Sequence, residues 1–331
     1  MKVTYFFRKP FQDYHSIEGV FENVQFYLKD KVQVRNYELK RYSSGILNRI
    51  LSCFEVNEQQ EDVNHITGDI HFIALGLNKR KTVLTIHDLA PLRNSRGLKH
   101  EILKFFWYQL PIWRVRYVTV ISEFTKKELL QTVKVNAEKV IVIPNPLPAD
   151  LKYHEKNQLS NKPILLQVGT AYNKNLEGLI QAIEGMEVRL LILGKLSTHQ
   201  LELLKAKEID YENAFNLEYN EVVAYYKRAD IVCFATFYEG FGLPILEAQK
   251  IGRAVITSNR CAMPETAGAG ALLIDPENPD DYREAICSLI QNEERRKSLI
   301  EAGLKNVERF EGTAVSQRYY DLYRKLHDTL R

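Results

Sequence analysis

Short apolar runs alternate with segments of helical periodicity along most of the chain. The runs are rich in Val and Ile and nearly continuous in apolarity, which is typical of parallel strands that are covered on both faces. Strands are predicted at residues 2–7, 32–37, 82–86, 117–121, 139–143, 164–168, 188–193, 213–217, 231–235, 254–257 and 271–274.

Amphipathic helices are predicted between these strands. Residues 176–183 place Leu and Ile at the i, i+3, i+4, i+7 spacing of one buried face. Residues 282–289 repeat the pattern after a capping Asn278 with proline at the first helical position, and residues 222–229 repeat it behind Asn220. This alternation predicts an α/β fold of doubly wound parallel sheets.

The pattern breaks once, at residues 143–163, where prolines and polar residues without periodicity indicate an interdomain linker. A chain of 331 residues is also longer than one compact core usually fills. We therefore expect an N-terminal domain at 1–146 and a C-terminal domain at 147–312. A helix with an aromatic stripe follows at 313–331, and packing back on the N-terminal domain is one role for it.

Composition narrows the class of protein. With 45% hydrophobic and 26% charged residues, the chain is typical of a globular protein. Its four cysteines lie far apart without a CxxC pair and are interpreted as reduced thiols. No signal peptide and no apolar run of about 20 residues is visible, so we expect a cytoplasmic protein.

Charge is distributed unevenly along the chain. Residues 1–150 contain 22 Lys+Arg and 16 Asp+Glu, a net +6, whereas the remainder contains 23 and 26, a net −3. A basic N-terminal half attracts an anionic membrane surface or a phosphorylated substrate. Scattered solvated lysines explain the same numbers equally well.

Two strand–helix turns carry the clearest candidate chemistry, because ligands in open α/β sheets bind beyond the carboxyl ends of strands. In QVGTAYNKNLEGLI (167–180), Gly169 ends a strand and Lys174 lies near a helix N-terminus that already favours an anion. Lys174 adds a full positive charge suited to phosphate, although a solvated lysine is the simpler interpretation when this turn is taken alone.

The second turn is FYEGFGLPILE (237–247), which begins after an apolar run. Its two glycines free the backbone to turn tightly and to present N–H groups to a diphosphate. Glu239 is then expected near the group that the phosphate carries, and Glu247 near a ribose diol. A capping carboxylate and an ordinary helix glutamate are common alternatives, but two acids, two glycines and a proline at one turn argue against them.

Two histidine-containing stretches are weaker candidates. His87 and Asp88 follow directly on a predicted strand in TIHDLAPL, where a side chain can reach a ligand, although a lone histidine is more often structural. The His and Asp residues of HITGDIHF (65–72) are of types that can bind a metal. Their spacing matches no metal motif, so structural packing is the preferred interpretation. P-loop, GxGxxG and GxSxG signatures are absent from the sequence.

Basic and aromatic residues are mixed in RNSRGLKHEILKFFWYQLPIW (93–113). This segment suits a membrane surface bearing a lipid-linked acceptor. A helix ending at Pro111, with most of its aromatic residues facing the core, is the preferred interpretation.

The chain resembles the retaining glycosyltransferases of family 4 over nearly its whole length. The motifs that carry this resemblance are GTAYNKNL, EGFGLP, HITGD, TIHDL, VISEFTKKEL and VIPNP. The resemblance implies the GT-B fold, in which two Rossmann-like domains face each other across a cleft. It assigns catalysis to Glu239, Lys174 and His87. It assigns donor binding to Gly169, Thr170, Lys174, Leu217, Glu218, Tyr219, Glu239, Gly240, Phe241, Gly242, Leu243 and Glu247.

The sequence also departs from the family pattern. RKPFQDYHSIEG (8–19) replaces a glycine-rich loop after the first strand. Arg8 and Ser16 from this segment, and Asp88 from TIHDLAPL, are the acceptor-side candidates. Thr170 stands where many members carry an arginine, so Lys174 is expected to bear more of the diphosphate charge.

The function implied by the resemblance is transfer of a hexosyl group from a UDP- or GDP-sugar to a glycan or lipid-linked hydroxyl. The setting would be bacterial surface polysaccharide synthesis (O-antigen, lipopolysaccharide or capsule). It implies no metal or other cofactor and no nucleic-acid partner, and a cytoplasmic enzyme that touches the inner face of an anionic membrane at most. A non-catalytic nucleotide-sugar-binding subunit and a GT-B sugar-nucleotide epimerase are the alternatives.

Overall fold

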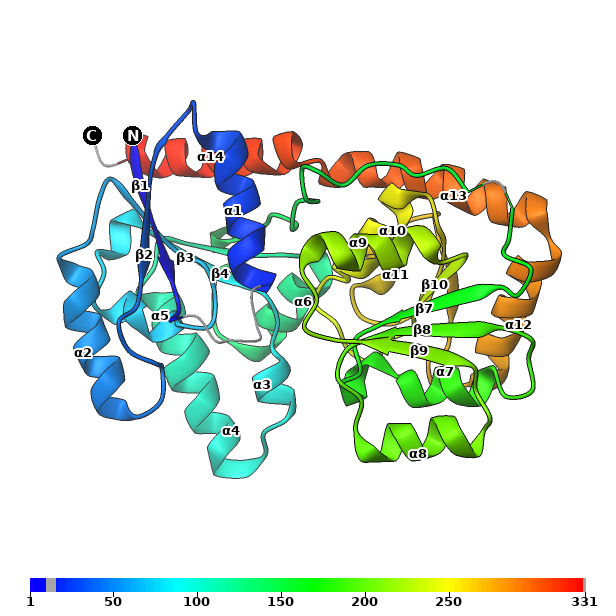
Figure 1. The fold of residues 1–331 in the computed structure, drawn as a ribbon. Helices are drawn as coiled ribbons and strands as arrows, with labels where there is room; N and C mark the ends of the chain where they lie inside the picture. Colours follow the sequence, from blue (N-terminus) through cyan, green and yellow to red (C-terminus); the bar gives the residue numbers. More distant parts are fainter. Residues whose placement is uncertain (10–15, 157, 330–331) are drawn as a thin grey trace. The chain divides into compact units, whose positions relative to one another are not determined.

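A computed structural model describes residues 1–9, 16–156 and 158–329. The chain divides into two compact units, and each is described here by itself (Figure 1). The N-terminal unit contains Met1–Ala149 together with Phe310–Arg331, and the C-terminal unit contains Asp150–Arg309. Each unit is built on a six-stranded sheet in which all strand pairs are parallel.

The sheet of the N-terminal unit positions several candidate side chains at its carboxyl edge. Its central strands are buried on both faces, which explains their continuous apolarity. In spatial order its strands are β2 (Gln33–Glu38), β1 (Lys2–Phe7), β3 (Val63–Ile66), β4 (Thr82–Ile86), β5 (Tyr117–Val120) and β6 (Val140–Val142).

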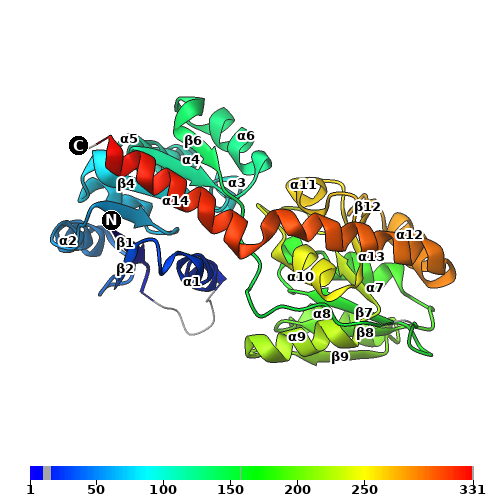
Figure 2. The same ribbon diagram turned by 90° about the horizontal axis from the view of Figure 1, so that it is seen from above.

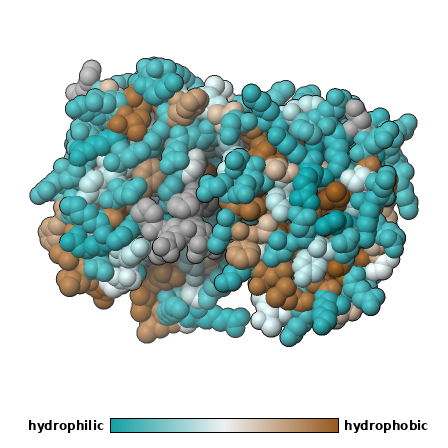
Figure 3. Space-filling model, viewed as in Figure 1, coloured by the Kyte–Doolittle hydropathy of each residue, from teal (hydrophilic) through white to brown (hydrophobic). Residues whose placement is uncertain are grey.

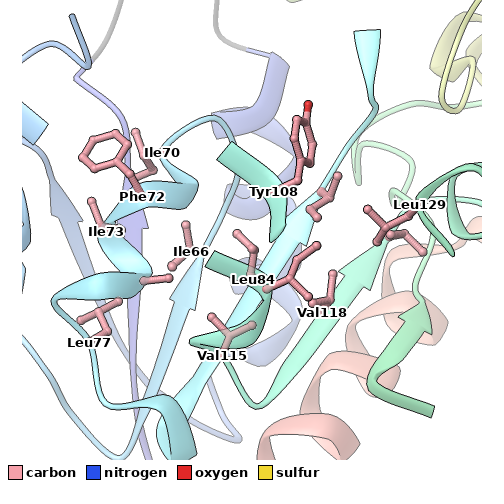
Figure 4. Close-up of a cluster of buried hydrophobic side chains, with 14 of the residues drawn as sticks. Ile66, Ile70, Phe72, Ile73, Leu77, Leu84, Tyr108, Val115, Val118 and Leu129 are labelled. Atoms are coloured by element: carbon pink, nitrogen blue, oxygen red, sulfur yellow. The ribbon is translucent and has the colours of Figure 1, made fainter. Parts of the chain in front are cut away.

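Two hydrophobic cores cover the faces of this sheet. Tyr5 lies in one core and Phe6 in the other, because successive strand residues point to opposite faces. The first core includes α1 (Ser16–Leu28) and α14 (Gly312–Asp328). The second core packs beneath η1 (His71–Leu75) and contains Ile66, Leu84 and Tyr108 (Figure 4).

The C-terminal helix α14 lies alongside α1 and is part of the N-terminal unit (Figures 1 and 2). Gly312 begins α14 so close to α1 that a Cβ there would lie 2.0 Å from Tyr27 Cε2. Tyr319 and Tyr323 are buried farther along the helix. The aromatic stripe of residues 313–331 therefore packs within this unit as far as the structure describes it.

Strand β3 is a strand that the sequence pattern did not predict. His65, in its middle, is fully buried, and its two ring nitrogens contact Tyr323 Oη at 2.6 Å and Thr85 Oγ1 at 2.7 Å. Tyr323 in turn donates to Tyr5 Oη at 3.1 Å. Because these polar groups pair with one another, a strand without a continuous apolar run is stable in the core.

The sheet of the C-terminal unit has its central strands, β10 and β7, side by side. Apolar side chains of α7 (Leu176–Ala182) and α12 (Pro279–Gln291) fill the core on one face. In spatial order the strands are β12 (Leu272–Ile274), β11 (Ala254–Ser258), β10 (Ile231–Phe234), β7 (Ile164–Val168), β8 (Arg189–Leu193) and β9 (Tyr211–Ala214).

Helices α9 (Tyr219–Arg228), α10 (Leu243–Ile251) and α13 (Glu293–Val307) pack together in the C-terminal unit. Asn278 caps α12 as predicted, accepting from Asp280 N at 3.1 Å. Helix α9 begins at Tyr219 with Glu218 as its N-cap, so Asn220 lies in the first turn of the helix predicted behind it. The strand predicted at 213–217 is displaced and ends at Ala214, because the αL turn at Asn216 intervenes.

The interpretation of residues 93–113 as a core-facing helix ending at Pro111 is wrong. Helix α4 (Gly97–Leu103) continues into a π-helix, η3 (Lys104–Gln109), and then into α5 (Leu110–Trp113). Phe105, Phe106 and Trp113 are exposed by 41%, 56% and 44%. A stripe along a helix cannot by itself identify which face meets the core. Among the described residues, no helix is long and apolar enough to cross a membrane.

Candidate functional site

The candidate donor site is formed by two turns that follow the neighbouring strands β7 and β10. Parallel strands bring their carboxyl ends to one edge of the sheet, so the turns at 169–175 and 235–242 lie side by side there. This places the two stretches singled out from the sequence in one locality.

The turn after β7 holds the backbone of Lys174 in place. Gly169 has φ +88°, and a Cβ there would lie 3.0 Å from Lys174 Cγ, so only glycine fits. The buried amide of Gln167 donates to Lys174 O at 2.9 Å. Asn175 adopts the left-handed conformation and donates to Ala235 O and Pro276 O, at 3.2 and 2.7 Å. Lys174 itself ends a short 3-10 turn, and α7 begins at Leu176 with Asn175 as its N-cap.

Lys174 and Glu239 form an ion pair across the two turns, with 2.5 Å between Nζ and Oε2. The side chains are 22% and 27% exposed, so both remain open to solvent. Lys174 Nζ also lies 4.8 Å from the centroid of the Phe234 ring. The structure therefore brings together the two side chains predicted to lie nearest the reacting group.

The turn after β10 leads directly into α10. Gly242 is its N-cap with φ +94°, and a Cβ there would lie 2.8 Å from Met263 Cε. Thr266 Oγ1 donates to Phe241 O at 2.6 Å and fixes the turn from the other side. Among the described residues, no side chain caps this N-terminus, so the electropositive end of α10 faces the carboxyl edge. Leu243 begins the helix.

Glu247 is buried in the second turn of α10, with 6% exposure. Its Oε2 accepts from Tyr226 Oη at 2.7 Å, and its Oε1 accepts from Tyr219 Oη at 3.2 Å. Burial raises the pKa of Glu247, and the hydrogen bonds from Tyr226 and Tyr219 act to lower it. The carboxylate is thus oriented, and each oxygen still has a lone pair for another donor.

The segment expected to hold a nucleobase, Leu217–Tyr219, follows β9 and enters α9. Tyr219 reaches from there to Glu247, as described above, which links the base segment to the ribose candidate. Glu218 donates its backbone N–H to Glu221 Oε2 at 2.8 Å in a capping arrangement. Thr170 donates its hydroxyl to Lys195 O at 2.7 Å, so this side chain supports the β8 turn.

Three unpaired polar atoms lie at this carboxyl edge. Among the described residues, Gln167 Oε1, Thr236 Oγ1 and Ser258 Oγ are buried without a hydrogen-bond partner. They belong to the ends of β7, β10 and β11, which are neighbours in the sheet. Buried polar groups without partners are uncommon, and their gathering here agrees with a ligand-binding edge.

Sequence reasoning missed the residues that support the candidate side chains. Asn173 donates to Tyr238 O at 3.0 Å and joins the two turns, and Tyr226 orients Glu247. Such pairings join residues far apart in the chain, so periodicity gives no signal for them. The asparagines beside Lys174 could have been suspected, because Asn tolerates αL and bonds to nearby backbone.

The N-terminal unit has its own cluster at the carboxyl edge of β1, β3 and β4. His87 Nε2 lies 2.7 Å from Thr67 O, and a Cβ at Gly68 would lie 2.9 Å from His87 Cδ2. Arg8 pairs with Glu18 at 2.9 Å and with Asp69 at 3.0 Å, so its charge is balanced within the cluster.

The remaining acceptor-side candidates are placed less fully. Asp88 accepts from Ala90 N at 2.9 Å and thereby shapes the turn into α3 (Ala90–Arg93). Ser16 begins α1, but its side chain and residues 10–15 of the loop RKPFQDYHSIEG lie outside the described residues.

The other histidines of the 65–72 stretch are structural. His71 is buried, and its Nδ1 lies 2.9 Å from Trp107 O, while His65 is enclosed by Tyr323 and Thr85. Over the part of the chain that the structure describes, no group of three or more His, Cys, Asp or Glu side chains could hold a metal ion.

Comparison with known proteins places both units in one class. The description "Glycosyltransferase Family 4" matches residues 25–151, and "Glycosyl transferases group 1" matches residues 150–306. O-antigen chain mannosyltransferase B of Escherichia coli is 26% identical over 269 residues, which cover 74% of this chain and 71% of that protein. O-antigen chain mannosyltransferase RfbU of Salmonella typhimurium is 24% identical, and the match covers 64% of this chain but only 62% of that protein.

Solved structures match almost the whole chain. Sucrose-phosphate synthase from Thermosynechococcus elongatus aligns with a TM-score of 0.82 at 16% identity, over 99% of both chains. HepE of Anabaena in complex with UDP-glucose aligns with a TM-score of 0.78 at 14% identity, over 98% of this chain and 100% of that one. At such identities the likeness shows the fold, which is GT-B, as predicted from the sequence.

Proposed function

The chain belongs to family 4 of the glycosyltransferases, and we propose that it moves a hexosyl group from a nucleoside-diphosphate sugar to a hydroxyl of a glycan or lipid-linked acceptor, with retention of anomeric configuration. The observation that carries this proposal is the Lys174–Glu239 pair, held between the Gly169 turn and the N-terminus of α10. A cation beside a helix N-terminus is suited to a diphosphate.

The donor is expected to replace the internal ion pair with contacts of its own. The diphosphate would take the charge of Lys174 and the N–H groups at the start of α10, while Glu239 would accept hydrogen bonds from sugar hydroxyls. Because Lys174 and Glu239 are both partly exposed, this exchange requires little repacking. Glu247, already oriented by two tyrosines, would accept from the ribose diol.

The proposed chemistry is a substitution on one face of the sugar. The bond between the anomeric carbon and the diphosphate oxygen breaks, and the acceptor oxygen bonds to that carbon on the same face. The acceptor's proton passes to the departing diphosphate, whose developing charge is stabilised by Lys174 and the α10 N-terminus. His87, on the N-terminal unit, would contact the sugar near the reacting centre, and Arg8, Ser16 and Asp88 are the acceptor-side candidates. No metal or other cofactor is required in this proposal.

The relatives suggest which substrates to test first. Several are named as O-antigen or serotype-specific mannosyltransferases, so mannose is the first sugar to test and a cell-surface polysaccharide the first acceptor class. Reported complexes of HepE with UDP and UDP-glucose support a nucleotide-sugar donor. We also propose a cytoplasmic enzyme that contacts an anionic membrane and no nucleic acid.

Transfer from GDP-mannose and UDP-glucose to a glycan acceptor tests the proposal directly. Lys174→Met and Glu239→Gln should each lower the transfer rate by about 100-fold or more, as expected when one electrostatic contact to the transition state is lost. Lys207→Met is the matched control, because Lys207 forms a comparable surface pair with Glu184 away from the site. Unchanged turnover in both site variants would refute the assignment of these residues.

The two alternatives predict different results. A non-catalytic subunit would bind the nucleotide sugar in a calorimetric titration without transfer or hydrolysis of any donor. An epimerase would convert the donor to its epimer in the absence of acceptor, which nuclear magnetic resonance of the sugar ring protons would detect.

A further inference from the structure

Basic side chains gather at the amino edge of the N-terminal sheet, opposite the edge where His87 follows β4. Strands β4, β5 and β6 are parallel neighbours, so their first residues lie side by side at this edge. Lys79 begins η2 (Lys79–Lys81), which leads into β4, while Arg116 and Lys139 directly precede β5 and β6. A base therefore stands before each of three adjacent strands.

Helix α14 adds a fourth base at the same place. It packs against η2, and Lys325 lies in its last turn. Lys325 Nζ and Arg116 Cζ each lie 5.4 Å from the centroid of the Tyr117 ring. Figure 3 shows mostly hydrophilic side chains where Figure 1 places the C-terminal end of α14. A helix C-terminus favours a cation, so Lys325 alone needs no ligand, but two cations on one ring bring like charges together.

These side chains line one cavity of about 390 Å³. The charged groups in its wall are Lys79, Arg116, Lys139, Lys325 and one acid, Glu138. With all four bases protonated, the wall carries a net +3. The volume lies within the range of sites that bind small molecules.

Over the part of the chain that the structure describes, none of the four bases forms an ion pair with an acid. Lys139 is the most enclosed of them, and its Nζ donates to the carbonyl of Ile112, a neutral group. Burial, followed by the charges of Lys79 and Arg116, lowers the pKa of Lys139 from its usual 10.5 to about 8. The cations therefore repel one another, and an anion placed between them would relieve this repulsion.

A diphosphate group suits this wall better than a carboxylate does. The guanidinium of Arg116 can hold two phosphate oxygens at once, and lysine ammonium groups bind phosphate as point charges. Two linked phosphates carry several negative charges against the net +3 of the wall, whereas a carboxylate carries one. Because the bases come from four segments around a cavity, they can surround a compact anion.

We propose that this cavity binds a small soluble diphosphate anion, at a site separate from the donor site. The donor's diphosphate would bind in the C-terminal unit, whereas this cavity lies wholly in the N-terminal unit. An anion here would link the last turn of α14 to the beginnings of β4, β5 and β6. Since α14 belongs to the core of this unit, binding would stabilise the N-terminal fold.

Calorimetric titration with inorganic pyrophosphate tests the proposal. The Lys174→Met protein, whose donor site lacks its cation, should still bind pyrophosphate. Arg116→Gln or Lys325→Gln, added to it, should weaken this binding about tenfold or more, because each exposed base makes one charge-assisted contact. Glu138→Gln should instead tighten the binding, because a like charge leaves the wall.

Lys29→Gln is the matched control. Lys29 Nζ lies 5.1 Å from the centroid of the Phe26 ring on α1, much as Lys325 lies over Tyr117, so its replacement should leave binding unchanged. Titration with UDP separates two sources of the anion. Affinity equal to that of pyrophosphate assigns the cavity to soluble diphosphates in general, and weaker affinity assigns it to the inorganic anion.

Urea unfolding gives an independent measurement, because both tryptophans lie in the N-terminal unit. Pyrophosphate should raise the urea midpoint of the tryptophan transition, and Lys139→Gln, which removes the enclosed charge, should lose this shift. All the cavity variants should keep the transfer rate measured without pyrophosphate, so failure of the donor-site chemistry is separable. Absence of pyrophosphate binding to Lys174→Met, or binding that Arg116→Gln and Lys325→Gln both leave unchanged, overturns the inference.

Discussion

Acidification from about pH 7.5 to about pH 5 is expected to destabilise the N-terminal unit by about 4 kcal/mol through two buried histidines, and replacement of His65 should remove half of that loss. His65 is fully buried between Tyr323 and Thr85. Burial, and secondarily the charge of His87, lowers the pKa of His65 from its usual 6.5 to about 3. Burial likewise lowers the pKa of His71 to about 4, against opposing effects of Asp69 and the Trp107 carbonyl.

The direction of the stability change with pH follows from which state, folded or unfolded, binds the proton more readily. With a folded-state pKa below the unfolded value, the unfolded chain takes up the proton first as the pH falls through about 6.5. Stability is therefore complete above that pH and is lost between about 6.5 and the folded-state pKa. About pH 5 lies about 1.5 pH units below the unfolded-state pKa of 6.5, so proton binding by the unfolded chain lowers the free energy of unfolding by about 2 kcal/mol per histidine.

Urea unfolding monitored by tryptophan fluorescence measures the stability of the N-terminal unit, because both tryptophans lie in that unit. His65→Gln keeps a donor and an acceptor toward Tyr323 and Thr85 but cannot titrate. Each protein is compared with itself at the two pH values, and exposed His199→Gln serves as the control. An identical loss in wild type and His65→Gln would refute the reasoning.

Three further perturbations test the C-terminal unit. Gly242→Ala, forced to φ +94° against Met263, should cost about 1–3 kcal/mol in thermal or urea unfolding and weaken nucleotide binding in calorimetry; unchanged values would contradict the strained turn. Tyr226→Phe removes a hydrogen bond that lowers the pKa of Glu247, so calorimetry should show nucleotide affinity falling from a higher pH than in the wild type. A parallel pH profile would contradict this. Burial raises the pKa of Cys233 to about 12, so iodoacetamide at neutral pH should leave Cys233 unlabelled until the unit unfolds, as peptide mass spectrometry would show.

Much of the sheet architecture could be predicted because parallel strands and capped helices carry local signals. β10 is a continuous apolar run, and α12 begins with Asn278 and proline where the sequence predicts it. β3 carries no such signal, since His65 is satisfied by partners from distant parts of the chain. Helix α2 (Ile46–Asn57) was also not predicted, although Ile46, Ile50 and Phe54 recur at helical spacing along one side of it.

Some features of the candidate site could likewise be predicted from the sequence, and others could not. The glycines that require positive φ, Gly169 and Gly242, are visible in the sequence because no other residue fits such turns. The contacts that orient the functional side chains are not visible, because Tyr226 meets Glu247 only when α9 packs beside α10. Which face of the α4–α5 run meets solvent is likewise decided by the rest of the unit.

The placement of α14 within the N-terminal unit has a consequence for biosynthesis. Val315, Tyr319, Tyr323 and Leu326 belong to the same core as β1 and α1, although almost the whole chain separates them. The ribosome releases these residues after residues 150–309, so the C-terminal unit is fully synthesised before the N-terminal core can close. The N-terminal unit therefore starts to be synthesised first but completes its core last. A chain shortened before α14 would lose part of the N-terminal core, although the cut lies beyond the C-terminal unit in the sequence.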